Sequence, residues 1–191
     1  MPGEVTSLPV DTAKDASRGI PPAQARRVAD IDWATWSAVD PATLAFVIRE
    51  GRILLIRKKR GLGAGKVNGP GGRIEPGETP AAGAARELQE ELGIRPVDLV
   101  RLGEHRFQFV DGYSTYVHVY RASDLRGTPV ETDEAVPLWV ALDAIPFDEM
   151  WEDDRLWLPL VVEGRRFSGY WIFDGDRMLD YRLDVLPESG P

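Results

Sequence analysis

The stretch of chain from residue 72 to residue 94 restricts the possible folds of this protein more than any other part of its sequence. Thr79 can cap a helix, and Pro80 after it is tolerated at the first helical position. Gly93 stands where helices commonly end. These signals predict a helix over residues 80–92.

Three carboxylates, Glu87, Glu90 and Glu91, lie on this predicted helix. Because residues three and four apart share one helix face, we expect the three groups side by side, where like charges repel. A hard divalent cation such as Mg²⁺ takes oxygen ligands and relieves that repulsion. A run of charges is also typical of a solvent-exposed helix face, so the spacing alone leaves both interpretations open.

Alternating β-formers, turn residues and helix caps predict the remaining elements. Strands dominate and helices are inserted between groups of them, which indicates an α/β sandwich with a mixed β-sheet. The predicted strands cover residues 43–49, 53–58, 99–110, 114–122, 136–142, 170–173 and 178–185. A second helix is expected over residues 154–162, capped by Asp153.

The full pattern from Gly72 to Ile94 reads Gly-x5-Glu-x7-Arg-Glu-U-x-Glu-Glu-x-Gly-U, with U aliphatic. This string resembles the signature of the Nudix hydrolase family. Further segments resemble the class of this family that hydrolyses oxidised purine nucleoside triphosphates, the MutT-type 8-oxo-dGTP diphosphatases; they are residues 61–72, 127–134, 145–151 and 151–154. The resemblance implies a Nudix α/β/α sandwich over residues 41–188. Residues 1–40 are then an N-terminal extension, partly flexible, whose composition permits a short helix in residues 22–39.

The resemblance also implies the chemistry, which is Mg²⁺-dependent hydrolysis (Mn²⁺ being an alternative) of a nucleoside triphosphate to monophosphate and pyrophosphate. The carbonyl of Gly72 would bind the metal. The carboxylates that would bind metal and take part in catalysis are those of Glu87, Glu90, Glu91 and Glu134.

Asn68 offers an amide donor and acceptor side by side, which suits a purine edge, although asparagine is also common in loops with left-handed backbone. The resemblance implies a substrate pocket in which Trp151 stacks on the base and an acidic pair meets its outer edge. One member of that pair would be protonated, because neighbouring carboxylates raise each other's pKa. Taken singly, each aromatic residue could be core and each aspartate only a helix cap. The full pocket set is Thr43, Lys58, Asn68, Phe107, Phe109, Trp151, Asp153, Asp154 and Phe173.

Three positions depart from the mammalian members of this class. Leu62, Val67 and Thr115 stand where those proteins carry Phe, Trp and Met. Smaller side chains at these positions predict a roomier pocket with weaker stacking.

Composition excludes several other functions. The chain has 23 Lys and Arg against 31 Asp and Glu, a net charge of −8, so we expect no nucleic-acid partner, and the cluster at residues 57–60 is interpreted as solvated charge. Without cysteine there is no thiol nucleophile.

No apolar run approaches the roughly 20 residues that span a membrane. The first 15 residues lack the apolar core of a signal peptide, so a cytoplasmic protein is expected. The choice between monomer and dimer stays open.

Two other functions remain open. The chain could hydrolyse another nucleoside diphosphate derivative, such as ADP-ribose, a dinucleoside polyphosphate or an alkylated nucleotide. A catalytically silent nucleotide-binding module is the other alternative, but such a module would be expected to lose signature glutamates, and all are present here.

Overall fold

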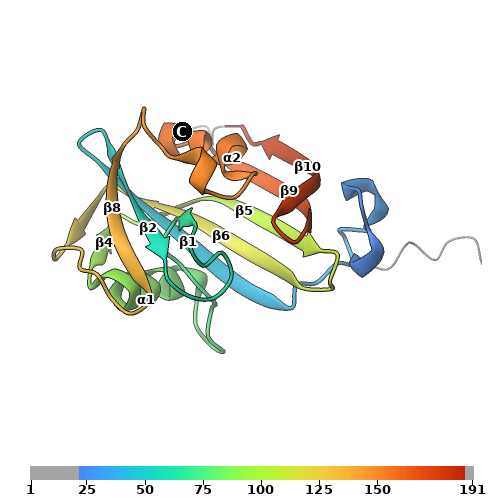
Figure 1. Cartoon of the computed structure of the whole chain (residues 1–191), viewed down its shortest axis with the longest axis horizontal. Coiled ribbons are helices and arrows are strands. Elements are labelled where there is room, and N and C mark those ends of the chain that lie inside the picture. Colours follow the sequence, from blue (N-terminus) through green and yellow to red (C-terminus); the bar gives the residue numbers. More distant parts are fainter. Residues whose placement is uncertain (1–21, 188–191) are drawn as a thin grey trace, which may run out of the picture.

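The computed structural model describes residues 22–187. Its centre is a mixed sheet in which the strands follow the order β10-β9-β5-β6-β1-β2-β3, with β8 also paired to β2 (Figure 1). The pairs β1–β6 and β5–β9 are parallel and the others antiparallel. The strands of this sheet are β1 (Asp40–Arg49), β2 (Arg52–Lys58), β3 (Val67–Asn68), β5 (Val100–Phe109), β6 (Ser114–Ala122), β8 (Ala135–Ala141), β9 (Phe167–Asp174) and β10 (Arg177–Val185). A small separate ribbon joins β4 (Arg95–Val97) and β7 (Asp124–Arg126), and the α-helices are α1 (Pro80–Leu92) and α2 (Asp154–Glu163).

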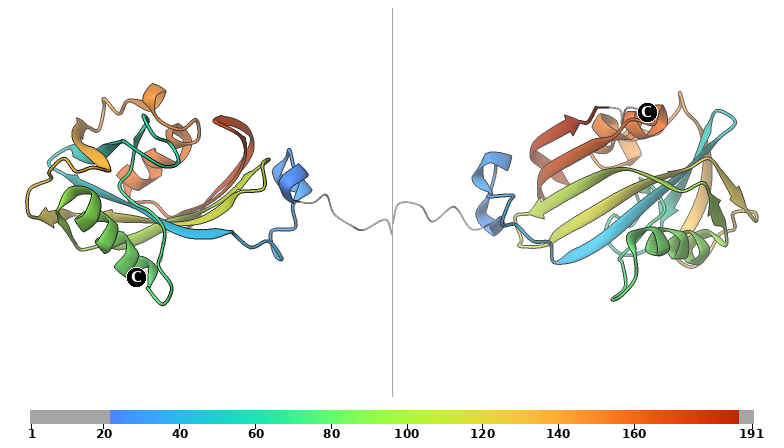
Figure 2. Two further views of the ribbon diagram at one scale, coloured as in Figure 1. Left: turned by 60° about the horizontal axis from the view of Figure 1, so that its bottom comes forward. Right: turned by 180° about the vertical axis from the view of Figure 1, so that it is seen from behind.

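The two helices cover opposite faces of this sheet (Figures 1 and 2). Side chains alternate between the two faces along β1. Ala45 and Val47 share a buried cluster with Leu88 of α1. Phe46 points the other way, and its ring centroid lies 5.8 Å from that of Trp157 in α2. The predicted α/β/α sandwich with a mixed sheet is therefore confirmed.

Helix α1 has the predicted bounds because both of its ends are set locally. The hydroxyl of Thr79 accepts a hydrogen bond from the Ala82 amide at 3.2 Å, and Gly93 adopts the left-handed backbone (φ 72°) that ends the helix. The predicted cap of α2 is wrong. Asp153 makes no capping hydrogen bond, because its Oδ2 accepts instead from Trp157 Nε1 at 2.8 Å.

In place of the one short helix that the composition of residues 22–39 permits, the structure has two 3-10 helices, Pro22–Gln24 and Val28–Asp30. Tertiary contacts override the local preference. The Val28 amide donates to the carboxylate of Asp180 in β10 at 2.8 Å, and Trp36 Nε1 donates to Gln108 of β5 at 2.9 Å. This segment, residues 22–38, packs beside β5, β9 and β10 (Figure 1).

The flexible tail expected over residues 1–21 lies outside the described residues, and the domain boundary at residues 40 and 41 stays a prediction. Within residues 22–187, none of the helices is long and apolar enough to cross a membrane.

His105 in β5 is fully buried on the α2 face of the sheet. Its Nδ1 accepts a hydrogen bond from Trp171 Nε1 at 2.9 Å, and the rings of Phe107, Trp157 and Phe167 surround it. Burial among these rings lowers the pKa of His105 to about 3.

This burial predicts a pH-dependent contribution to stability. The unfolded histidine binds a proton near pH 6.5 and the folded one does not, so the free energy of unfolding falls as the pH drops below about 6.5. His105→Gln removes that dependence. In urea titrations, the difference in free energy of unfolding between the wild type and the variant should narrow by about 1.5 kcal/mol from pH 6.5 to pH 5. The buried carboxyl groups are common to both proteins and cancel in the comparison; a gap that stays constant with pH would contradict the prediction.

Candidate active site

A cavity of about 320 Å³ opens on the α2 side of the sheet. The structure brings all of the residues predicted for the substrate pocket to its wall. These are Thr43, Lys58, Asn68, Phe107, Phe109, Trp151, Asp153, Asp154 and Phe173. They come from β1, β2, β3, β5, β9 and the start of α2, so the fold and not sequence proximity assembles the pocket.

Aromatic rings form one wall of the cavity. Trp151 meets Phe173 edge to face, with centroids 5.7 Å apart, and Phe109 lies 6.4 Å from the Trp151 ring. The backbone of Trp151 is fixed as well, because its amide donates to Asp154 Oδ2 at 3.0 Å. Trp151 is therefore held by ring contacts at its side chain and by a hydrogen bond at its backbone, and it lines the cavity.

Asp153 and Asp154 are only 2% and 3% exposed, yet both line the cavity. Burial raises the pKa of each carboxyl group, and the charge of Asp153 raises that of Asp154 further. Asp153 Oδ1 is buried without a hydrogen-bond partner among the described residues. A neutral carboxyl in this pair can donate a hydrogen bond while its ionised neighbour accepts one.

Asn68 belongs to the short strand β3 and lacks the left-handed backbone that its alternative interpretation as a loop residue assumed. Its side-chain oxygen accepts from the Gly69 amide at 2.8 Å. The amide nitrogen, with two N–H groups, remains for a ligand in the cavity.

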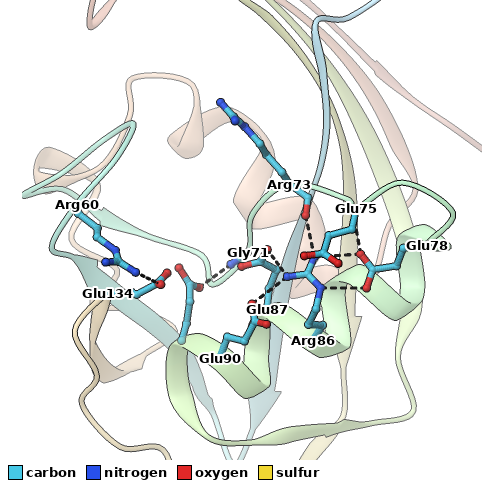
Figure 3. A network of polar contacts seen from close by, with 10 residues as sticks. Arg60, Gly71, Arg73, Glu75, Glu78, Arg86, Glu87, Glu90 and Glu134 are labelled. Atoms are coloured by element: carbon cyan, nitrogen blue, oxygen red, sulfur yellow. Dashed lines mark hydrogen bonds and ion pairs between the residues drawn. The ribbon is translucent and has the colours of Figure 1, made fainter.

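Beyond the cavity, one guanidinium group organises the signature glutamates (Figure 3). Arg86 donates to Glu78 at 3.0 Å, to Glu87 at 2.9 Å and to Glu90 at 2.9 Å. It also donates to the carbonyl of Arg73, at 2.8 Å. These bonds raise the pKa of Arg86 and fasten the loop before α1 to the helix.

Glu91 lies deeper than the other signature glutamates. It is 1% exposed, and its Oε2 accepts from the Gly71 amide at 2.8 Å. Burial raises the pKa of Glu91 to about 7. Gly72 lies against Glu87, because a Cβ at that position would lie 2.5 Å from the Glu87 carboxylate oxygens and would displace that group. Glu134 reaches the same region from the loop before β8 and pairs with Arg60.

The described residues contain no converged group of three or more His, Asp or Glu side chains that would already hold a metal ion. The reason is visible in Figure 3, where Glu87 and Glu90 bond to Arg86 and Glu134 bonds to Arg60. The set still fits a hard cation, because Gly72 and the glutamates offer only oxygen donors and the missing Cβ of Gly72 leaves room for a carboxylate. The metal-ligand set stays a prediction.

Several cavity residues were missed by sequence reasoning. Arg73, Tyr113 and Trp157 also line the cavity. Of these, only Trp157 could have been found from the sequence, because it follows Asp153 by four residues and therefore lies on the same face of the predicted helix. Among the three departures, Leu62 and Thr115 line the cavity, whereas Val67 is fully buried in the core.

Comparison with known proteins gives a consistent result. The family model for the NUDIX domain matches residues 39–161. The oxidized purine nucleoside triphosphate hydrolase of Danio rerio is 45% identical over 148 residues, which is 76% of this chain and 95% of that protein. The Mus musculus protein of the same name is 43% identical, over 74% of this chain and 92% of its own length.

Solved structures share the fold. The MutT protein from Bacillus halodurans superposes with a TM-score of 0.70 at 24% identity, over 76% of this chain and 98% of that one. A MutT NUDIX hydrolase from Burkholderia pseudomallei gives 0.59 at 32% identity, over 64% and 97%. The signature, the sandwich and these matches together show that the chain is a member of the Nudix hydrolase family.

Proposed function

We propose that this enzyme hydrolyses oxidised purine nucleoside triphosphates, such as 8-oxo-dGTP, to the monophosphate and pyrophosphate. Through this activity it would remove damaged precursors from the nucleotide pool. The observation that carries the proposal is the buried pair Asp153 and Asp154 on the cavity wall, where burial raises the pKa of both carboxyl groups. The names of the 45% and 43% identical relatives support the same substrate class.

The pocket residues account for the preference in chemical terms. Trp151 offers an indole face for stacking, and Asn68 offers amide donors for a purine acceptor. The acid pair can present either a donor and an acceptor or two acceptors, depending on its proton count. Oxidation changes the donor and acceptor pattern of a purine edge, so an adjustable pair suits oxidised bases.

The phosphates would lie toward the signature glutamates. Lys58 lines this end of the cavity, and its positive charge also acts on Glu87 and Glu91. Nudix hydrolases generally use divalent metals. Here Mg²⁺ would be held by the carbonyl of Gly72 and by Glu87, Glu90, Glu91 and Glu134. When bound, the ion neutralises phosphate charge and lowers the pKa of a bound water. A signature glutamate accepts the proton of the attacking water.

The substrate class is tested by a specificity profile. We expect kcat/KM in the presence of Mg²⁺ to be higher for 8-oxo-dGTP and 2-hydroxy-dATP than for dGTP, O6-methyl-dGTP and ADP-ribose. Pyrophosphate and monophosphate are quantified separately. Preference for ADP-ribose or for O6-methyl-dGTP would replace the proposed substrate, and absence of turnover on all five would point to a silent module.

Glu91→Gln tests the catalytic carboxylates. Glutamine keeps an oxygen that can accept from the Gly71 amide, so the fold and the melting temperature should be retained. Losing the charge should lower kcat by about two to four orders of magnitude in steady-state assays. Gln89→Ala, on an exposed position of the same helix, is the control. Near-normal turnover by Glu91→Gln would refute its assignment.

Trp151→Ala tests stacking. Removal of the indole should weaken binding of the purine triphosphate by about 1 to 3 kcal/mol, measured as a higher KM. Trp139→Ala removes a half-buried tryptophan outside the cavity and should leave KM unchanged. An unaltered KM in Trp151→Ala would remove the stacking role.

A further inference from the structure

Lys66 ends the glycine-rich loop between β2 and β3, two residues before Asn68. The loop is closed by its own backbone. The Lys58 amide donates to the Lys66 carbonyl at 3.0 Å, and the Gly65 amide donates to the Lys58 carbonyl at 2.8 Å. The Cα of Lys66 is therefore fixed relative to β2 and to Asn68.

The side chain of Lys66 reaches across to two other parts of the molecule. Its ammonium lies 5.0 Å from the centroid of the Trp151 ring, within the range of a cation–π interaction. The same ammonium lies 3.0 Å from Asp176, in the turn between β9 and β10. Only a quarter of the Lys66 side chain is exposed, whereas Asp176 is 72% exposed, so water screens the ion pair from the side of Asp176.

The loop also contacts the edge of the indole through its backbone. A Cβ at Gly63 would lie 3.0 Å from Trp151 Nε1, and Gly63 has the positive φ of 77° that suits glycine. Trp151 lines the cavity, whereas neither Gly63 nor Lys66 does. Lys66 thus lies over one face of the indole and Gly63 next to its Nε1 edge, and both approach it from outside the cavity lining.

The charge of Lys66 also acts on Asp154, the first residue of α2, three residues after Trp151. The buried carboxyl of Asp154, which accepts the Trp151 amide, is stabilised in its ionised form by Lys66. Its other charged neighbour is Asp153, which in turn faces Glu152. Lys66 is thus the cation that opposes the effect of burial on this carboxyl group.

We propose that Lys66 is a positioning residue of the nucleotide pocket. Bridged to Asp176, it holds the Trp151 indole in the orientation that stacks on a purine, without itself touching the substrate. The inference rests on the proposed function, because it assumes that Trp151 contacts the base. It adds the β9–β10 turn to the parts of the chain that determine base binding.

The structure offers a matched control for this role. Arg49 lies 5.1 Å from the centroid of Trp139 and 2.7 Å from Asp124, so it makes the same two kinds of contact outside the cavity. Arg49→Met therefore removes a cation–π contact and an ion pair without changing the pocket. Lys66→Met keeps the apolar length of the side chain but removes its charge, and Lys66→Arg keeps the charge.

The experiment measures kcat and KM on the triphosphate that the wild-type enzyme hydrolyses fastest, and the Kd of 8-oxo-dGMP by calorimetry. Lys66→Met should raise KM and Kd by about three- to tenfold, with kcat changed by less than about twofold. Lys66→Arg should stay within about twofold of wild type. Asp176→Asn should raise KM less than Lys66→Met does, because the cation–π contact remains. Arg49→Met should leave KM and Kd unchanged.

The pH dependence of KM gives a further readout that a purely structural role would not alter. Without the cation, the carboxyl pair should lose its proton at higher pH, so the midpoint of the KM profile should shift upward in Lys66→Met. The midpoint should not shift in Lys66→Arg or Arg49→Met.

Two outcomes would overturn the inference. One is a Lys66→Met variant whose KM and Kd are as unchanged as those expected of the control Arg49→Met. The other is an equal loss in Lys66→Met and Lys66→Arg accompanied by a lower melting temperature, which would show that only packing is involved. A wild-type preference for a substrate other than an oxidised purine would refute the proposed function instead, and the same variants compared on that substrate would still decide the role of Lys66.

Discussion

The position of the signature carboxylates depends on one guanidinium group. Arg86 bonds to three glutamates and to a backbone carbonyl, so it joins α1 to the loop that carries Gly71 and Gly72. That loop in turn bonds to β1, where the Thr43 amide donates to the Gly72 carbonyl at 2.8 Å. Helix α1, the loop and the central strand β1 are therefore connected by hydrogen bonds. The same loop also lines the cavity, through Gly71 and Gly72.

The two faces of the sheet have different roles. On the α1 face, apolar contacts such as Val47 with Leu88 fix the helix that carries the glutamates. On the α2 face, the aromatic rings of β5 and β9 border a cavity that is also lined by the buried carboxyl groups of Asp153 and Asp154 and by the half-buried amide of Asn68. Because burial strengthens electrostatic effects, these few carboxyl and amide groups can distinguish ligands that differ in one donor or acceptor.

The sequence predicted those features that local signals determine. Thr79 and Gly93 are sufficient to define α1, and the residues that the family resemblance names for a pocket all line one cavity, while their binding roles stay a prediction. Features that depend on distant partners could not be predicted. Trp157 Nε1 donates to the Asp153 carboxylate that was expected to cap α2, and the Val28 amide donates to Asp180, 152 residues away. Likewise, nothing in the sequence relates Lys66 to Asp176, because the two residues are far apart along the chain and come together only in the folded structure.

The segment formed by residues 22–38 shows that the folding unit extends beyond the family domain. The family match begins at residue 39, yet Ala25, Val28 and Ile31 are buried against Ile172 of β9. Trp33 and Trp36 pack on the same cluster. A chain that began at residue 39 would present this apolar surface to water beside β10, at the edge of the sheet, where strands of other molecules can pair. Residues 22–38 are therefore part of the packed structure, because they cover apolar side chains of β9 and β10 that the family domain alone would leave exposed.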